Sequence, residues 1–258
     1  MIVLKSEQDL DLMGPACELA QVVLDEVCTY VKPGVTTRQV DEFAARRIDS
    51  YGAKSAFLGY RKYPCHVCLS VNEQVVHGLA TDVRLKFGDI ISLDVGVVYN
   101  GFIGDTARTV AVGGCSVLAQ RLMDVTEQSL YFGIAQAVEG NRVVDISRAI
   151  QRHVESNGYS VVREFVGHGV GRSMHEEPQV PNFDDGKKSP KLTAGMTIAI
   201  EPMVNAGRPE VKILKDGWTV VTRDGQLSAH FEHTVLITKS EPKILTCRSK
   251  TQSTLRSQ

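Results

Sequence analysis

Long apolar segments are missing from this sequence. No run of eighteen apolar residues occurs, and the opening MIVLKSEQDL lacks the apolar core of a signal peptide. An excess of one charge is missing too, because the formal net charge is -1. There is therefore no electrostatic reason to invoke nucleic acid or an anionic membrane as a partner. We expect a cytoplasmic protein that binds neither.

A disulfide framework is also missing. The six cysteines are scattered along the chain. Cys65-x-x-Cys68 has no second pair to complete a zinc tetrahedron and no thioredoxin-like flanking pattern. We interpret all of them as reduced thiols: Cys17, Cys28, Cys65, Cys68, Cys115 and Cys247.

What is present is a chain of 258 residues, 43% of them hydrophobic. This is enough for a large core, organised as one large domain or as two closely packed halves. The last residues, RSKTQSTLRSQ, are polar. We expect a single domain over residues 1–248, followed by a flexible tail over residues 249–258.

The most informative segment is a predicted β-hairpin at residues 90–109, IISLDVGVVYNGFIGDTART. Asn100-Gly101 supplies the two positive φ values of a two-residue type I′ turn. The resulting register pairs Gly96 with Asp105 and places Asp94 one diagonal step away. Because the side-chain period is two, both aspartates share a face, about 7 to 8 Å apart.

The surrounding strand is apolar, which indicates that these two carboxylates are buried. Like charges about 4 Å apart repel by roughly 4 kcal/mol at an effective dielectric near 20, so the pair needs a cation or a proton. Gly96, without a side chain, is interpreted as leaving room for an ion. The alternative is a salt-bridged or surface hairpin. It is less favoured because the only adjacent basic residue, Arg108, points to the other face by parity.

The two halves of the chain resemble each other at an offset of 106 to 107 residues. Leu85-x-x-Gly88 precedes ISLD, and Leu192-x-x-Gly195 precedes IAIE in the same register. Segments of equal length bracketed by glycines, 34–52 and 140–158, also recur. The offsets indicate a duplication with pseudo-repeats over roughly 1–112 and 113–240, in which Asp94 and Glu201 are equivalent.

Each half begins with helices and continues with strands. Capping-box patterns open helices after Ser6 and Thr36, and Gly14-Pro15 is expected to kink the first of them. Residues 182–195 are expected to form a loop. Helices outside a central sheet bury one face of each element. The predicted helices cover 7–30, 36–52, 117–137 and 143–157, and the predicted strands cover 66–72, 90–98, 102–111, 161–166, 196–204, 218–222 and 228–238.

The second half supplies further candidate ligands. If Glu201 mirrors Asp94, the mirror of Asp105 should come from an adjacent strand, and Glu232 in SAHFEHTVLIT is the candidate. His168 lies between glycines, which let the backbone pass close to a ligand. We assign it as the sole nitrogen ligand. Four carboxylates and one imidazole suit a pair of divalent ions, and favour manganese, iron or cobalt over zinc, which remains an option.

These segments resemble a known family. SVNEQVVHG, SLDVGVVYNGFIGDTART, GHGVGRSMHEEPQV, AIEPMVNAG, KDGWTV and SAHFEHT stand in the order and spacing of bacterial type I methionine aminopeptidases. The resemblance covers essentially the whole chain. It implies an α+β fold, the duplicated pita-bread fold of the creatinase and aminopeptidase family. Two pseudo-symmetric halves then form a central antiparallel sheet with outer helices.

The resemblance also implies an activity and a ligand set. The enzyme is expected to be a metalloaminopeptidase that removes the initiator methionine from nascent proteins with a small second residue. Two metals activate the attacking water. The implied ligands are Asp94, Asp105, His168, Glu201 and Glu232, with Asp105 and Glu232 bridging.

Three residues receive catalytic roles from the resemblance. Glu201 is expected to move the proton, His175 to stabilise the oxyanion, and His77 to hydrogen-bond the scissile peptide nitrogen. Read alone, His77 is a turn residue and His175 a cap for Glu176 or Glu177. The implied methionine pocket consists of Tyr60, Tyr63, Cys68, Met174 and Trp218.

Met174 departs from the family, in which an aromatic residue usually precedes the histidine, so the shape of the pocket is left open. Tyr60 and Tyr63 could equally be half-buried aromatics. The expected partner is a peptide or nascent-protein N-terminus. The zinc-binding N-terminal extension of longer relatives is missing. We therefore expect a monomer that is only transiently near the ribosome and does not dock through such a segment.

Two other functions are weighed against this one. A prolidase or aminopeptidase P relative would share the fold, but LGYRKYP and the absence of an added N-terminal domain argue against it. A non-catalytic peptide-binding module would be expected to lose ligands, and all five are present.

Overall fold

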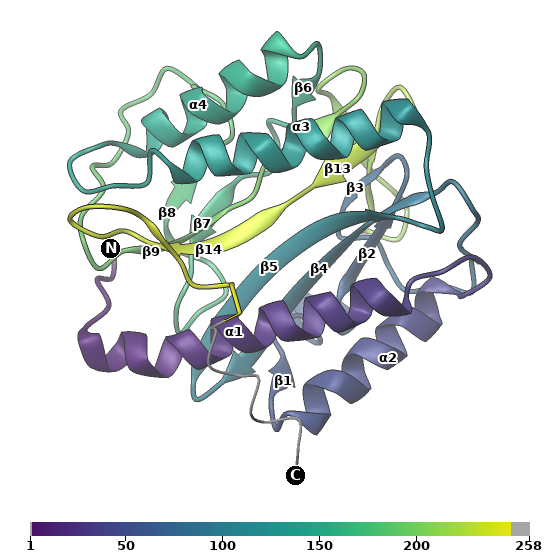
Figure 1. Ribbon diagram of the computed structural model, residues 1–258, viewed down its shortest axis with the longest axis horizontal. Coiled ribbons are helices and arrows are strands. Elements are labelled where there is room, and N and C mark those ends of the chain that lie inside the picture. The colour runs from purple at the N-terminus through teal and green to yellow at the C-terminus, as the bar shows by residue number, and fades with distance from the viewer. Residues whose placement is uncertain (1, 249–258) are drawn as a thin grey trace.

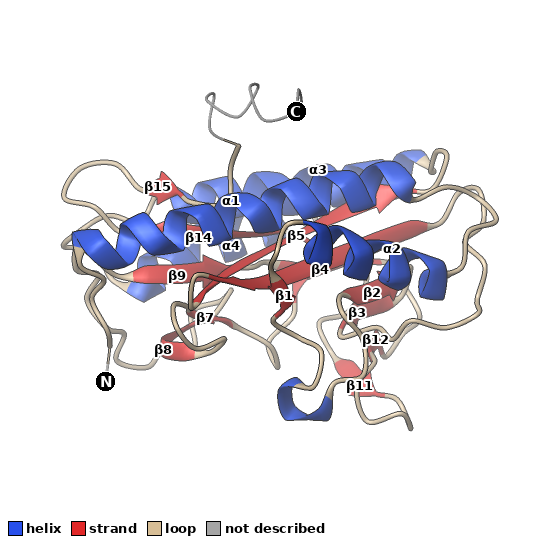
Figure 2. Ribbon diagram, turned by 90° about the horizontal axis from the view of Figure 1, so that it is seen from below, coloured by secondary structure: helices blue, strands red, loops and turns tan. Residues whose placement is uncertain are grey.

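Among the described residues, four helices lie along one side of a broad antiparallel sheet (Figure 2). The structure is a computed structural model that describes residues 2–248. The predicted tail, 249–258, lies outside the described residues. The helices are α1 (Glu7–Tyr30), α2 (Thr37–Ser50), α3 (Val117–Ile134) and α4 (Val143–Ser156), with a short 3-10 turn, η1 (Tyr60–Lys62).

Local sequence signals start the helices where expected. The Ser6 hydroxyl accepts from the Asp9 N–H, and the Asp9 carboxylate accepts from the Ser6 N–H, which completes the predicted capping box of α1. Thr36 and Gln39 form the same reciprocal pair at α2. The helix α1 continues through Pro15 as one element. The helix α3 ends at Ile134, three residues earlier than predicted.

The large sheet contains nine strands, in the order β1-β4-β5-β14-β9-β7-β8, with β2 on β4 and β15 on β14. Two three-stranded sheets, β13-β10-β6 and β11-β12-β3, complete the fold. The strands are β1 (Lys54–Ser55), β2 (Cys68–Val71), β3 (Gln74–Val76), β4 (Ile90–Tyr99), β5 (Phe102–Ala111), β6 (Ser160–Val161), β7 (Gly167–Gly169), β8 (Glu176–Val180), β9 (Thr197–Ile200), β10 (Met203–Asn205), β11 (Val211–Ile213), β12 (Val220–Thr222), β13 (Ser228–His230), β14 (Glu232–Leu236) and β15 (Lys243–Ile244).

Two predicted strands are broken in the structure. The segment 196–204 divides into β9 and β10 at Glu201-Pro202, because a proline has no N–H to donate to a strand ladder. The segment 228–238 divides at Phe231 into β13 and β14, which belong to different sheets. The strand predicted at 161–166 is wrong beyond Val161. The loop at 182–195 is confirmed, apart from an isolated bridge at Lys191.

The two halves have corresponding arrangements of helices and strands. In Figure 1, α1 and α2 accompany the strands of the first half, and α3 and α4 accompany those of the second. The halves meet where β5 pairs with β14. The strand pair β4-β5 of the first half therefore lies beside the pair β14-β9 of the second half in one sheet. The Gly34 N–H donates to the Leu85 carbonyl, and the Gly140 N–H donates to the Leu192 carbonyl at offsets of 106 and 107 residues. This correspondence supports the proposed pseudo-repeats over 1–112 and 113–240.

The hydrophobic core is divided between the two halves in the same way. One buried apolar cluster packs α3 and α4 against second-half strands, and another packs α1 and α2 against first-half strands. All six cysteines lie within the described residues and are unpaired, as expected. Among residues 2–248, no helix has the length and apolar character that crossing a bilayer demands.

Candidate metal centre

Four adjacent strands each contribute one acid to the same site. Asp94 lies on β4, Asp105 on β5 and Glu232 at the start of β14, and Glu201 directly follows β9. Because β4, β5, β14 and β9 are neighbours in this order, each half of the chain contributes two acids to the site. Pro202 ends the pairing of β9, which frees Glu201 from the ladder at this point.

The hairpin that carries the first two acids has the predicted register. Gly96 pairs with Asp105, Asp94 pairs with Ala107, and φ is positive at both turn residues. Arg108 points to the opposite face, where it contacts Asp25 of α1. The interpretation of Gly96 was wrong. A Cβ atom there would lie 2.6 Å from Cε1 of Phe57, so the missing side chain accommodates an aromatic ring and not an ion.

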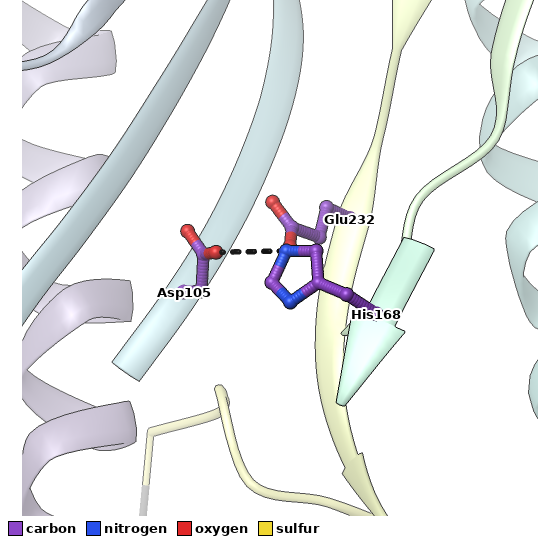
Figure 3. Close-up of side chains that lie close together, drawn as sticks. All are labelled: Asp105, His168 and Glu232. Atoms are coloured by element: carbon purple, nitrogen blue, oxygen red, sulfur yellow. Dashed lines mark ion pairs between the residues drawn. The ribbon is translucent and has the colours of Figure 1, made fainter. Parts of the chain in front are cut away.

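His168 of β7 faces the acids of the first and second halves (Figure 3). Its Nε2 lies 3.7 Å from Asp105 Oδ2 and 3.5 Å from Glu201 Oε1. Ligand atoms of Asp105, His168 and Glu232 all lie within 4.8 Å of one another. The Nδ1 atom contacts the Gly169 carbonyl at 2.9 Å. A carbonyl only accepts, so this contact places the proton on Nδ1 and leaves the Nε2 lone pair facing the acids.

Protein groups compensate the charge of the acids only in part. One carboxylate oxygen each of Asp94, Asp105 and Glu232 is buried without a hydrogen-bond partner in the described chain. Burial raises the pKa of Asp94 to about 7. Burial, followed by the charge of a neighbouring acid, raises the pKa of Asp105 and of Glu232 well above the usual range. In the absence of a cation, burial therefore favours the protonated form of each of these groups.

A divalent metal fits this donor set. A cavity of about 100 Å³ is lined by all five expected ligands, by His77 and His175, and by apolar side chains. No Lys or Arg lines this cavity, so no side-chain cation neutralises the acids there. Carboxylate oxygens with one imidazole are the ligands of hard or borderline divalent ions.

The two histidines expected to contact substrate also line the cavity. His77 directly follows β3 with φ 58 and packs edge-on against Phe165, with ring centroids 5.5 Å apart. The ring of His175 lies 4.3 Å from that of His168. Burial lowers the pKa of His77, and burial followed by the nearby His168 lowers the pKa of His175 to about 4. Both imidazoles are therefore neutral at pH 7.

The residues of the expected methionine pocket are brought together in one apolar cluster. Tyr63 meets Trp218 edge-on, with centroids 5.0 Å apart. Cys68 pairs directly with Asp94 across β2 and β4, so the cluster adjoins the acids. The cluster contains Tyr60, Tyr63, Cys68, Met174 and Trp218.

Three residues near the site were not anticipated. Phe57 belongs to the same apolar cluster, and Phe165 lines the cavity. The third, His230, is 2% exposed, and its Nε2 lies 3.5 Å from Glu201 Oε2. His168 is thus not the only imidazole that faces the acids. The sequence does contain a signal for His230. His230 and Glu232 are two positions apart in an apolar segment, so an extended strand places both side chains on the same face.

Comparison with known proteins defines the class. The sequence profile of metallopeptidase family M24 matches residues 11–239, so the chain belongs to this family of metal-dependent peptidases. Its membership implies the use of a divalent metal.

Individual relatives indicate which kind of M24 peptidase the chain resembles. A methionine aminopeptidase of Clostridium perfringens is 51% identical over 246 residues, 95% of this chain and 99% of that protein. The crystal structure of a methionine aminopeptidase from Rickettsia prowazekii superposes with a TM-score of 0.94 at 40% identity, covering 96% of this chain and all of that one. The resemblance to methionine aminopeptidases and the pita-bread fold are thereby confirmed.

Prolidases share the fold at a greater distance. The prolidase from Pyrococcus furiosus has a TM-score of 0.79 at 22% identity, and the match covers 96% of this chain but only 66% of that one. This likeness concerns the fold alone.

Proposed function

We propose that this chain removes the initiator methionine from peptides and nascent proteins whose second residue is small. The observation that carries the proposal is the convergence of Asp105, His168 and Glu232, whose ligand atoms lie within 4.8 Å of one another. The apolar cluster with Met174 and Trp218 adjoins this site. A thioether side chain suits a soft, largely apolar slot.

The proposed cofactor is a pair of divalent ions, with manganese, iron or cobalt favoured over zinc by the oxygen-rich donors. The ligands would be Asp94, Asp105, His168, Glu201 and Glu232. Asp105 and Glu232, on the two central strands, are the proposed bridging acids. When bound, such ions activate a water molecule and polarise the scissile carbonyl.

The protein groups then move protons and stabilise charge. Glu201 accepts the proton of the attacking water and delivers it to the leaving amine. His175, neutral at pH 7, donates to the oxygen that becomes negatively charged. His77 hydrogen-bonds the nitrogen of the scissile peptide. The side chain of the substrate methionine occupies the pocket of Tyr60, Tyr63, Cys68, Met174 and Trp218.

The partner is a free peptide N-terminus. The proposed setting is the cytoplasm, where a monomer meets nascent chains near the ribosome. This setting follows from the substrate, because an initiator methionine is exposed as soon as a nascent chain emerges.

The proposal is tested by metal-dependent release of methionine. The protein is dialysed against a chelator and given Met-Gly-Met-Met, then manganese or cobalt, and free methionine is measured by chromatography. We expect release only after metal addition. Asp105→Asn should abolish release, whereas the control Asp82→Asn, on a side chain that is 81% exposed, should not.

Two outcomes would contradict the proposal. Inactivity with every divalent metal, combined with peptide binding, would indicate a non-catalytic module. Preferential cleavage of Xaa-Pro peptides over Met-Ala peptides would instead assign the site to a prolidase-like reaction.

A further inference from the structure

His230 is a buried imidazole that the proposed reaction does not use. It ends β13 and is 2% exposed. Its Nε2 has no hydrogen-bond partner among the described residues. A buried polar nitrogen that stays unpaired costs about 1–3 kcal/mol, so an unpaired one calls for a partner in the working protein.

Glu201 is a candidate partner. Oε2 of Glu201 lies 3.5 Å from Nε2 of His230, and Oε1 of the same carboxylate lies 3.5 Å from Nε2 of His168. The carboxylate is therefore flanked by two imidazoles, one on each oxygen. A good N–H···O bond is about 2.7–3.2 Å long, so a shift of a few tenths of an ångström would close the contact with His230.

The main chain of His230 is fixed in place. Its N–H donates to the Thr109 hydroxyl at 2.8 Å, and that hydroxyl donates to the His230 carbonyl at 2.9 Å. The Thr109 hydroxyl also lies 2.8 Å from that of Ser92 on β4. Because Thr109 is on β5, a strand of the first half holds the main chain of His230 beside Glu201.

His230 is not placed as a metal ligand. All five proposed ligands line the cavity described above, whereas His230 does not line it. The carboxylate of Glu201, in contrast, needs a hydrogen-bond donor to hold it in one orientation. The terminal torsion of a glutamate is broad, so its two oxygens exchange places easily unless one is held.

We propose that His230 is a positioning residue, whose Nε2–H donates a hydrogen bond to Glu201 Oε2. This bond holds the carboxylate plane and keeps Oε1 on the side of His168 and the metal site. The assignment deepens the proposed function and rests on it for the catalytic readout. Groups that orient metal ligands in this way typically change metal affinity or activity by about 10–100-fold when removed.

The test compares a variant that keeps a donor with two that do not. His230→Gln retains an N–H donor, whereas His230→Leu and His230→Met remove it at similar volume. We measure kcat and KM for a Met-Ala peptide, and manganese affinity by calorimetry. We expect His230→Leu and His230→Met to lose about 10–100-fold in kcat with little change in KM, and about tenfold in manganese affinity. His230→Gln should stay within about threefold of the parent protein in both.

A matched control excludes a general effect of removing a histidine. His153 on α4 also has a buried, unpaired Nε2, but it packs against Phe132 on the outer helices. His153→Leu should leave kcat and manganese affinity unchanged. If His230→Gln is as impaired as the donor-free variants, or if those variants match the parent protein, the proposal is overturned. Loss of manganese binding in all three His230 variants would overturn it in favour of a direct ligand.

The calorimetric readout separates this inference from the proposed function. If the parent protein binds manganese but releases no methionine, the proposed function fails. The affinities of His230→Gln and His230→Leu still decide whether His230 holds Glu201.

Discussion

The hydroxyl of Tyr60 lies 2.8 Å from Nδ1 of His175, and the two rings stack with centroids 5.4 Å apart. Tyr60 was predicted only as a wall of the methionine pocket. It belongs to that apolar cluster, but its hydroxyl also contacts a histidine that lines the cavity. This contact occupies Nδ1, which leaves Nε2 of His175 as the free ring nitrogen.

Tyr60→Phe should therefore affect the chemical step more than the binding of methionine. The ring and its apolar surface remain, whereas one hydrogen bond is lost, which is worth about 0.5–1.5 kcal/mol. We expect kcat to fall about 3- to 10-fold, with KM changed by less than about twofold. Steady-state kinetics on a Met-Ala peptide measure this split. Tyr30→Phe, in the stacked pair with Phe43, serves as the control and should be neutral.

Asp105→Asn should separate stability from activity. Burial opposes ionisation of Asp105, and one of its oxygens has no partner among residues 2–248. A neutral amide removes this cost, so we expect the metal-free variant to melt a few degrees higher at pH 8. For a domain of this size, about 1 kcal/mol corresponds to about 2–4 °C. Thermal melts with and without manganese should show that the stabilisation by metal is lost. A lower metal-free melting temperature would contradict this account.

Metal binding and stability should depend on pH in opposite directions. The pKa of Asp94 is raised by burial from 3.8 to about 7, so the metal-free folded protein holds a proton that the unfolded chain releases. The stability linked to this proton is present below about pH 4 and is lost as the pH rises toward 7. A metal replaces the proton, so its affinity should rise over the same window.

This dependence is measured on chelator-treated protein. Its melting temperature should fall between pH 5 and pH 8, and the increase on adding manganese should become larger. Asp94→Asn should flatten the fall in the metal-free protein. A metal-free melting temperature that rises with pH would show that Asp94 ionises freely in the folded state.

The first-half acids could be predicted because their geometry is local. Asn100-Gly101 fixes the turn, the turn fixes the register, and the register places Asp94 and Asp105 on one face. The second-half acids depended on the repeat, which transferred this geometry to Glu201 and Glu232. Convergence of the two pairs required the junction of β5 and β14, which no local signal encodes.

The residues that were missed depend on contacts between distant segments. Gly96 was interpreted from its neighbours on the hairpin, whereas the ring that fills its place comes from Phe57. His230 was passed over although a continuous strand would already have placed it on the same face as Glu232. In the structure the chain changes sheets at Phe231, and Nε2 of His230 lies 3.5 Å from Oε2 of Glu201. Contacts between separate segments decided both, as for Tyr60 and His175, which lie 115 residues apart in the sequence.

A buried ion pair fixes the segment that carries His175. Lys5 Nζ lies 2.6 Å from Glu176 Oε2, with side chains 3% and 13% exposed. The other oxygen of Glu176 accepts the N–H groups of Arg172 and Ser173. The chain before α1 is thus tied to the loop that precedes His175.

Removing one partner of this pair should cost more than removing both. Lys5→Met leaves the Glu176 carboxylate without its cation, and Glu176→Gln leaves a buried ammonium without its anion, so each should lower the free energy of unfolding by about 3 kcal/mol. The double variant removes both charges and keeps an oxygen acceptor for the Arg172 and Ser173 N–H groups. We expect it to recover more than about 1 kcal/mol relative to the sum of the single losses. Urea unfolding of the four proteins measures this coupling, and strictly additive losses would mean that the two charges do not depend on each other.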